Sequence, residues 1–307
     1  MTHVQVPTEF TSPTGNVPLY SDSIGYCQSY DFSLANISEE SRIAAISTIA
    51  SVCYNSPKAL GSISLYNRLA AESAGLPSSS FEFVPVLLKP YHIASAPFRS
   101  CHKYGELITH NNSTYLLTNL RALMADVGDR ANEYFNTPEE CAIIAKHFKV
   151  FKWHIPLFVA RQAMRHRCSW QELSRRYVSG KKMDFDFYIP SKLADVCIDI
   201  YSGTVQGQDA YAEIDWEELH SFALQLYNKA IDQGIKPELA RTILPQSMYT
   251  TIWSAWLPYQ LESFFKLRLD KHAQYEIREL AASMKYLLTD TSAEGVTYNS
   301  FKESILN

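Results

Sequence analysis

Seven basic residues fall between positions 161 and 182, and the single acidic residue among them is Glu172. The seven are Arg161, Arg165, Arg167, Arg175, Arg176, Lys181 and Lys182. The run follows the apolar segment PLFVA, so its first arginines rise from an element rooted in the core. Guanidinium groups held rigidly in this way can bind an anion through forked donors. With the hydroxyl of Ser174 and the carboxylate of Glu172 nearby, the pattern suits a nucleotide, with phosphate at one end and a polar base at the other.

The spacing of these residues predicts which of them point together. On a helix, Gln162 and Arg165 are three positions apart and Arg161 and Arg165 are four apart, so both pairs share a face. Ser174 and Arg176 are two apart and point the same way if the chain there is extended. Two other interpretations stay open on spacing alone. A charge run is often a solvated helix face, and basic residues can also bind nucleic acid, although Trp170 and Tyr177 are the only aromatic residues available for stacking.

The elements that must position these residues can be read from the pattern on either side. Residues 147–154 alternate as a strand, and Pro156 then opens a helix that runs through Arg167. Residues 169–180 are expected to loop out of that helix, and 184–191 to be extended. Further helices are expected over residues 39–52, 62–74, 216–233, 237–244 and 258–288, and residues 114–127 begin as a strand and become helical. Short strands before long helices indicate the α+β class.

Composition excludes several classes of protein. Of 307 residues, 46% are hydrophobic and 20% charged, which is typical of a folded globular chain. Lys and Arg total 28 against 32 Asp and Glu, so a long nucleic acid is not the expected partner. The six cysteines form no CxxC pair, so we expect no metal site and a reducing compartment. No signal peptide and no membrane-spanning run is expected, and the default location is the cytoplasm.

The segment ARQAMRHRCSWQELSRRYV at 160–178 resembles the signature of flavin-dependent thymidylate synthases, in which RHR is followed by Ser and then commonly Arg-Tyr. Two later blocks, ARTILP at 240–245 and LRLDKHAQYEIRELA at 267–281, resemble the family in order and spacing. The likeness covers residues 147–285 well and SSFE at 79–82 weakly. It implies an α+β fold with a mixed sheet and long helices, which assembles as a homotetramer with active sites at subunit junctions. Residues 1–307 would form one catalytic domain with an extra inserted segment at about 84–146.

The resemblance also implies a reaction. Reduced FAD would supply a hydride, methylenetetrahydrofolate the one-carbon unit, and NADPH would reduce the flavin, so that dUMP becomes dTMP. The family needs no protein nucleophile, and the sequence shows no convincing activated cysteine or Ser-His-Asp set.

Carried over by position, the family's dUMP-binding residues are Gln162, Arg165, Ser174, Arg175, Arg176, Arg241 and Arg268. Arg268 and Ser174 would be catalytic, because Arg268 matches the arginine that stabilises the ionised N3 of the pyrimidine. Glu172 would lie between nucleotide and flavin. Arg165, His166 and Arg167 match residues of the flavin and folate site, and Ser79 matches a small hydroxyl near the flavin.

The chain departs from the family pattern at several of these positions. Six residues, not the usual seven, separate RHR from Ser174, and Arg175 stands where many members have a small residue. The family's C-terminal Asn-x-Arg, which binds FAD, is replaced by Leu257-Pro258-Tyr259. We hypothesise that Asn119 and Arg121, in the inserted segment, bind the flavin in place of that motif. The alternative is that this Asn-x-Arg is an ordinary helix cap.

Two further functions stay open at this point. The altered positions are compatible with a related C5 hydroxymethylase or methylase that acts on dUMP, UMP or dCMP. A non-catalytic nucleotide-binding or RNA-binding protein is the alternative from another class.

Overall fold

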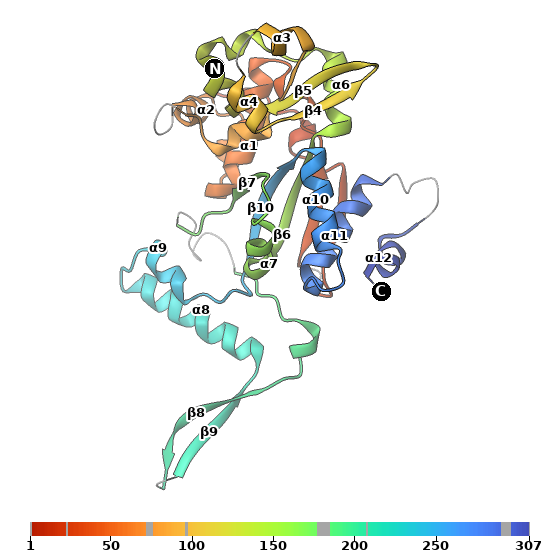
Figure 1. Cartoon of the computed structure of the whole chain (residues 1–307). Coiled ribbons are helices and arrows are strands. Elements are labelled where there is room, and N and C mark those ends of the chain that lie inside the picture. Colours follow the sequence, from red (N-terminus) through yellow and green to blue (C-terminus); the bar gives the residue numbers. More distant parts are fainter. Residues whose placement is uncertain are drawn as a thin grey trace.

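We describe the fold from a computed structural model, which describes residues 2–22, 24–71, 76–95, 98–176, 185–206, 208–289 and 296–306. Figure 1 shows three parts: an upper lobe, a central sheet flanked by helices, and a lower arm that ends in a projecting hairpin. Lys181, Lys182 and Tyr177 lie outside the described residues. No helix in the described part of the chain is long and apolar enough to cross a membrane.

The central sheet has five strands in the order β1-β2-β6-β10-β7. They are β1 (Gly15–Pro18), β2 (Tyr26–Tyr30), β6 (Lys149–Pro156), β10 (Tyr249–Trp256) and β7 (Ser169–Glu172). Every pair is antiparallel, as are the pairs of the other sheets in the described residues. The predicted α+β class is therefore confirmed, but the predicted mixed sheet is wrong. The physical reason is that β10 runs back along the whole length of β6, with Tyr249 opposite Pro156 and Trp256 opposite Lys149.

The alternation along β6 gives the sheet two different faces. Phe151, Trp153 and Ile155 are fully buried beneath α10 (Pro258–Arg268) and α11 (Tyr275–Leu288), together with residues of α7 (Leu157–Ala163). Lys152 and His154 point to the opposite face, since successive side chains of a strand alternate. The C-terminal helix α12 (Tyr298–Leu306) packs outside α11, beside the sheet in Figure 1.

The upper lobe combines the N-terminal helices with the predicted insertion. Its elements are α1 (Glu39–Tyr54), α2 (Ile63–Ala70), η5 (Ser79–Phe83), β3 (Pro85–Leu88), α3 (Pro90–Ser95), α4 (Arg99–Lys103), β4 (Glu106–His110), β5 (Ser113–Asn119), α5 (Leu120–Val127), η6 (Gly128–Glu133) and α6 (Pro138–His147). The strands form a three-stranded antiparallel sheet in the order β3-β5-β4. One hydrophobic core joins this lobe to Val150, Trp253 and Ala255 of the central sheet.

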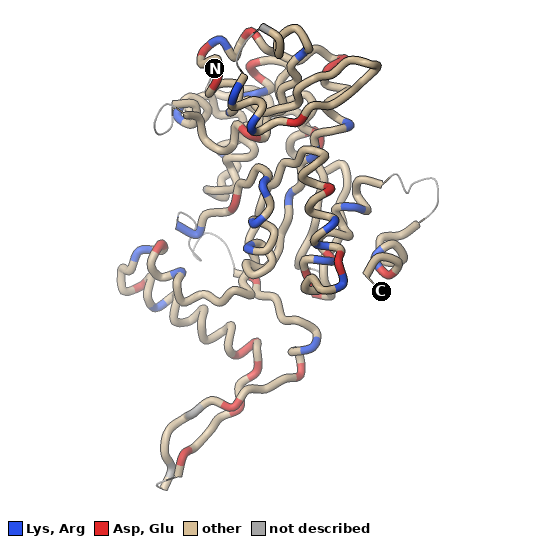
Figure 2. Tube along the Cα trace, viewed as in Figure 1, with Lys and Arg blue, Asp and Glu red and all other residues tan. Residues whose placement is uncertain are grey.

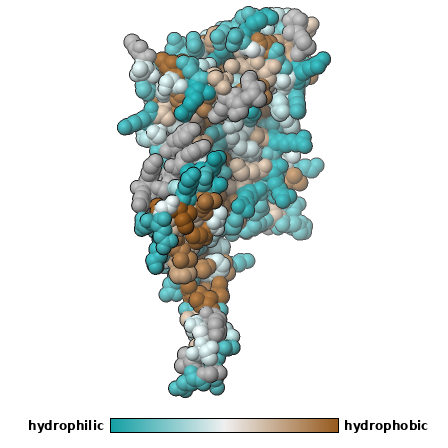
Figure 3. Space-filling view, turned by 90° about the vertical axis from the view of Figure 1, so that its left-hand side faces the viewer, coloured by the Kyte–Doolittle hydropathy of each residue, from teal (hydrophilic) through white to brown (hydrophobic). Residues whose placement is uncertain are grey.

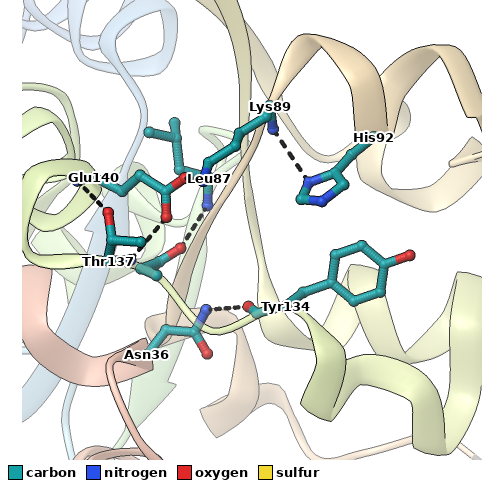
Figure 4. A network of polar contacts seen from close by, with 8 residues as sticks. Asn36, Leu87, Lys89, His92, Tyr134, Thr137 and Glu140 are labelled. Carbon is teal, nitrogen blue, oxygen red and sulfur yellow. Dashed lines mark hydrogen bonds and ion pairs between the residues drawn. The ribbon is translucent and has the colours of Figure 1, made fainter.

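Polar contacts fasten the insertion to the N-terminal part of the lobe and also join segments within the insertion (Figure 4). The side-chain amide of Asn36 donates to the carbonyl of Tyr134 at 2.9 Å, and the Lys89 ammonium pairs with Glu140 at 3.0 Å. Glu140 also accepts from the backbone N–H of Thr137, which closes a capping box at the start of α6. The expectation of one domain with an insertion at about 84–146 stays a prediction that these contacts favour.

The lower arm consists of η7 (Ser191–Leu193), the hairpin β8 (Ile198–Val205) and β9 (Gln208–Ile214), α8 (Trp216–Asp232), α9 (Pro237–Ala240) and η8 (Arg241–Ile243). Apolar side chains remain exposed on it: Phe222, Leu226, Ile235, Leu239 and Ile243. Figure 3 shows a hydrophobic area, in brown, on the arm above the tip of the hairpin. In Figure 2, Lys and Arg gather around α7 and the end of β7, whereas the hairpin carries acidic positions. The sequence pattern did not predict this hairpin.

Two local predictions next to the basic run are wrong. The helix that follows Pro156 ends at Ala163, so Arg165 is not on it, and neither Gln162 nor Arg161 shares a helix face with Arg165. Ser169–Glu172, predicted as loop, is strand β7. Both differences have one cause: the chain turns after Ala163 so that β7 can pair with β10. The predicted helix over 258–288 is likewise two helices, α10 and α11.

Candidate functional site

A cavity of about 600 Å³ opens between α7, the end of β7, β10 and η8. Five polar residues of its wall were singled out in the sequence: Arg161, Glu172, Ser174, Arg175 and Arg241. The elements that carry them are separated by up to 80 positions in the chain, and the pairing of β7 with β10 helps to bring them together. The cavity therefore concentrates three guanidinium groups around the carboxyl of Glu172 and the hydroxyl of Ser174.

Arg175 is the most buried of these charged groups. It is 5% exposed, and its Nε and Nη1 atoms have no hydrogen-bond partner in the described residues. Its guanidinium carbon lies 4.3 Å from the centre of the Phe185 ring. Burial lowers the pKa of Arg175, although a guanidinium stays charged near neutral pH. A buried cation without an acceptor is costly to the fold, and a bound anion would remove that cost.

Arg176 lies outside the cavity. The chain turns at Arg175 and Arg176, and the backbone N–H of Arg176 donates to the Ser174 hydroxyl at 3.4 Å. The Arg176 side chain is exposed, with its Nε 3.9 Å from Glu238. The condition for Ser174 and Arg176 to point the same way, an extended chain, is not met. Ser174 shares the cavity wall with Arg175 instead.

Glu172 is held by its neighbour on the central strand. The Thr250 hydroxyl donates to Glu172 Oε1 at 2.9 Å, and burial raises the pKa of Glu172. Nearby Arg241, Arg161 and Arg175 oppose that rise. Thr250 was missed in the sequence because β10 was not recognised. The signal was present in the β-branched and aromatic residues of YTTIWSAW.

A second group of predicted residues meets at the C-terminal end of α7, outside the lining of this cavity. Arg268, the last residue of α10, donates from Nε to His166 Nε2 at 2.9 Å and from Nη2 to the carbonyl of Gln162 at 2.9 Å. Burial and then the adjacent Arg268 charge lower the pKa of His166, which fits its role here as an acceptor. Burial and the charge of Arg165 lower the pKa of Arg268. The side-chain amide of Gln162 donates to Gln274 at 2.8 Å.

The two groups are distinct within one chain. Gln162, Arg165, His166 and Arg268 are not among the residues that line the cavity of Arg175. Arg165 and Arg167 are exposed on the turn after α7 and form no ion pair within the described residues.

The predicted flavin residues lie on the lobe side of the molecule. Ser79 donates to Gln171 of β7 at 2.7 Å. Asn119 accepts from the N–H of Ala122 at 2.9 Å and thus caps α5, as the alternative interpretation expects. Arg121 donates to Glu82 and to the carbonyl of Pro77, both at 2.7 Å. Asn119, Arg121 and Glu82 line a cavity of about 350 Å³, and flavin contact by Asn119 and Arg121 stays a prediction.

Comparison with known proteins bears on the part of the chain that carries the two groups. The family model "Thymidylate synthase complementing protein" matches residues 143–292. A flavin-dependent thymidylate synthase of Kosmotoga olearia is 33% identical over 159 residues, which is 50% of this chain and 67% of that relative. The chain belongs to the flavin-dependent thymidylate synthase family. Another member, from Aquifex aeolicus, is 37% identical over 145 residues, 46% of this chain and 45% of that relative.

The chain spans about half to two thirds of the length of the family members it matches. The family region contains both groups of residues described above and leaves most of the upper lobe outside it. Among solved structures, a UMP/dUMP methylase PolB from Streptomyces cacaoi bound with 5-Br UMP matches with a TM-score of 0.36 and 25% identity, over 52% of this chain and 75% of that chain. In the described residues, no group of three or more His, Cys, Asp or Glu could hold a metal ion.

Proposed function

We propose that this protein is a flavin-dependent thymidylate synthase that transfers a one-carbon unit from methylenetetrahydrofolate to C5 of dUMP. The observation that carries the proposal is the buried guanidinium of Arg175, whose Nε and Nη1 have no hydrogen-bond partner among the described residues, in a cavity that also presents Ser174, Arg161 and Arg241. Forked donors and a hydroxyl around one cavity match the chemistry of a nucleotide phosphate. The nucleotide phosphate binds to Arg175, Arg241 and Ser174.

Arg268 acts on the pyrimidine. Its fork is held from two sides, by His166 and by the main chain of α7, so it does not reorganise when charge develops. A preorganised, permanently charged donor stabilises the ionised N3 of uracil, and this makes C5 more nucleophilic. Gln162 and Arg165 hold the base beside Arg268, and Glu172 stands between the nucleotide and the flavin.

The two groups of residues meet between subunits of a homotetramer. Within one chain, the cavity of Arg175 and the cluster around Arg268 are distinct, so one subunit supplies the phosphate site and another the pyrimidine site. The exposed apolar side chains of the arm, from Phe222 to Ile243, support this assembly (Figure 3). An apolar area of this kind on a projecting arm is typical of a surface that is covered in an oligomer.

The donors on the turn after α7 fit a flavin dinucleotide. Arg165 and Arg167 are exposed cations without a carboxylate partner in the described residues, which suits the pyrophosphate of FAD. His166 and Ser79 complete the flavin and folate site, and Asn119 and Arg121 would bind the flavin in place of the family's C-terminal Asn-x-Arg. Reduced FAD would supply the hydride, and NADPH is the proposed reductant.

Cys168 is not suited to act as a nucleophile. Burial raises the pKa of Cys168, the cysteine nearest to the RHR segment, well above its usual range, and a thiol of this kind is inert. Cys27, Cys101, Cys141, Cys168 and Cys197 are free thiols, which suits the reducing cytoplasm, where we place the protein.

The proposal is tested with the purified full-length chain. We expect a yellow protein, or one that turns yellow on reconstitution with FAD, whose visible spectrum changes when dUMP is added. With NADPH and methylenetetrahydrofolate it should release the C5 hydrogen of dUMP. A chain that binds dUMP but neither takes up FAD nor turns over would instead be a non-catalytic nucleotide-binding protein.

A second candidate function follows from Arg175. A long cation where many family members have a small residue changes the sugar or phosphate contacts, and this favours a related methylase or hydroxymethylase that acts on dUMP, UMP or dCMP. Mass analysis of the product decides between them. A hydroxymethyl group adds one oxygen beyond the methyl, and turnover of dCMP would show an amino-pyrimidine substrate.

A further inference from the structure

A second cavity, of about 500 Å³, lies on the opposite face of the central sheet. Its roof is α1, with Thr48, Ser51 and Asn55, and its floor is the sheet, with Tyr26, Lys152 and Thr251. Thr250 lines the cavity of Arg175 and Thr251 lines this one, because neighbouring side chains of β10 point to opposite faces. The family chemistry proposed above does not use this cavity.

The cavity contains a cation, Lys152, that has no counter-ion among the described residues. Lys152 is half-buried on β6, and its ammonium has no oxygen partner within the described residues; the centre of the Trp253 ring lies 5.6 Å from it. Burial lowers the pKa of Lys152, which reflects the loss of water around it. A lysine in this setting gains from a ligand that brings a negative charge.

Aromatic rings make up a large part of the remaining wall. Tyr30 and Trp253 lie 4.5 Å apart by ring centres, and Tyr26 stacks on His154 at 5.4 Å. The rings come from three adjacent strands, β2, β6 and β10, so they are fixed by the ladder of the sheet rather than by a loop. Rigid rings beside a polar opening can hold a flat ligand.

Neither His154 nor Asp186, the other titratable side chains considered in this cavity, is suited to bind an anion, so Lys152 is the anion-binding group. His154 Nδ1 lies 3.0 Å from the Thr251 hydroxyl, and burial lowers the pKa of His154, so the ring is neutral near pH 7. Asp186 is the acidic residue of the lining, and it lies at the rim, 3.8 Å from His154 Nε2, with its side chain 45% exposed. The residues that α1 contributes are uncharged.

We propose that this cavity is a second ligand site, which binds a small planar aromatic carboxylate with its carboxylate on Lys152 and its ring against Trp253 and Tyr26. The site is separate from the nucleotide cavity, with which it shares the wall residue Leu173. The inference does not depend on the proposed reaction.

The test uses 2-naphthoate as the probe and the neutral 2-naphthamide as its isostere, with binding measured by isothermal titration. We expect saturable naphthoate binding and at least about tenfold weaker binding of the amide. Lys152→Met should weaken naphthoate by at least about tenfold, whereas Lys152→Arg should retain it. Arg175→Met, which alters the other cavity, should leave naphthoate binding unchanged, and a circular-dichroism melt checks that each variant folds.

Three outcomes would overturn the proposal. In the first, the parent protein fails to bind naphthoate. In the second, the parent protein binds naphthamide as tightly as naphthoate, or the Lys152→Met variant binds naphthoate as tightly as the parent protein does, and either result would show only non-specific apolar binding. Displacement of naphthoate by dUMP or FAD would show that the cavity belongs to the reaction site and is not a second site. None of these measurements requires turnover, so a failure of the proposed thymidylate synthase activity would be seen separately.

Discussion

Arg175→Met is predicted to stabilise the free protein and to weaken its binding of nucleotide. Methionine keeps most of the length and the apolar stem of arginine, so the packing against Phe185 largely remains, while the charge and the two unmet donors are removed. Opposite effects on stability and affinity are expected for a residue that is placed for a ligand and not for the fold.

The magnitudes follow from the contacts of Arg175. A buried donor without a partner costs about 1–3 kcal/mol, and Arg175 has two, Nε and Nη1. The cation–π contact with Phe185 stabilises the parent protein by about 0.5–2 kcal/mol, and methionine would lose this contribution. At the middle of these ranges, the free energy of unfolding of Arg175→Met should therefore rise by about 3 kcal/mol. A hydrogen bond to a charged group contributes about 1.5–3 kcal/mol, so dUMP should bind roughly 10- to 100-fold more weakly.

Urea unfolding without ligand and titration calorimetry with dUMP measure the two quantities. Arg176→Met is the matched control, because Arg176 is the adjacent residue but is exposed beside Glu238. Its free energy of unfolding should change by less than about 1 kcal/mol, and its reduction in dUMP affinity should be smaller. The reasoning is refuted if Arg175→Met is less stable than the parent and binds dUMP equally well, or if Arg176→Met weakens dUMP binding more.

Three other variants test the rest of the site. A lysine at position 268 cannot reproduce the two hydrogen bonds that the Arg268 guanidinium donates to His166 and to the carbonyl of Gln162. In Arg268→Lys, product formation should therefore fall more than about tenfold while the flavin spectrum is retained. Unchanged turnover would contradict this role of Arg268. Because burial raises the pKa of Glu172, its contribution to stability is present below the ordinary carboxyl pKa and is lost as pH rises through the raised value. Denaturant midpoints from about pH 4 to pH 8 should show this loss in the parent and not in Glu172→Gln. Asn119→Ala should lower the free energy of unfolding by about 0.5–2 kcal/mol, whereas Asn119→Asp keeps the cap. Weaker FAD binding by the folded Asn119→Asp variant would support flavin contact, and unchanged FAD binding by a folded Asn119/Arg121 double alanine variant would refute it.

Helix caps and strand alternation, which depend on residues only a few positions apart, could be predicted from the sequence. Ser38 was expected to cap the first long helix and does so, with its hydroxyl accepting from the N–H of Ser41. Thr137-Pro138 was expected to begin a helix, and a capping box forms there. The alternation before Pro156 predicted strand β6. Each of these depends on side chains that act on the backbone of the same segment.

The ends of the elements around the site depended on distant partners. The helix after Pro156 ends at Ala163, and Ser169–Glu172 forms a strand. Both features follow from the pairing of Ser169–Glu172 with β10, which lies some 80 residues later in the chain. Strand β10 itself is buried along its whole length, so it lacks the alternation by which a half-exposed strand is recognised.

The sequence by itself determined the family, through ordered blocks whose residues are recognisable without their positions in space, and it predicted the basic run as the functional region. Only the tertiary structure decided how those residues are divided. It buried Arg175 in the cavity, left Arg176 on the surface, and joined Arg268 to His166 at a separate place. The physical reason is that residue type sets what a side chain can bind, whereas its direction and its neighbours are set by turns and strand pairings between segments far apart in the chain.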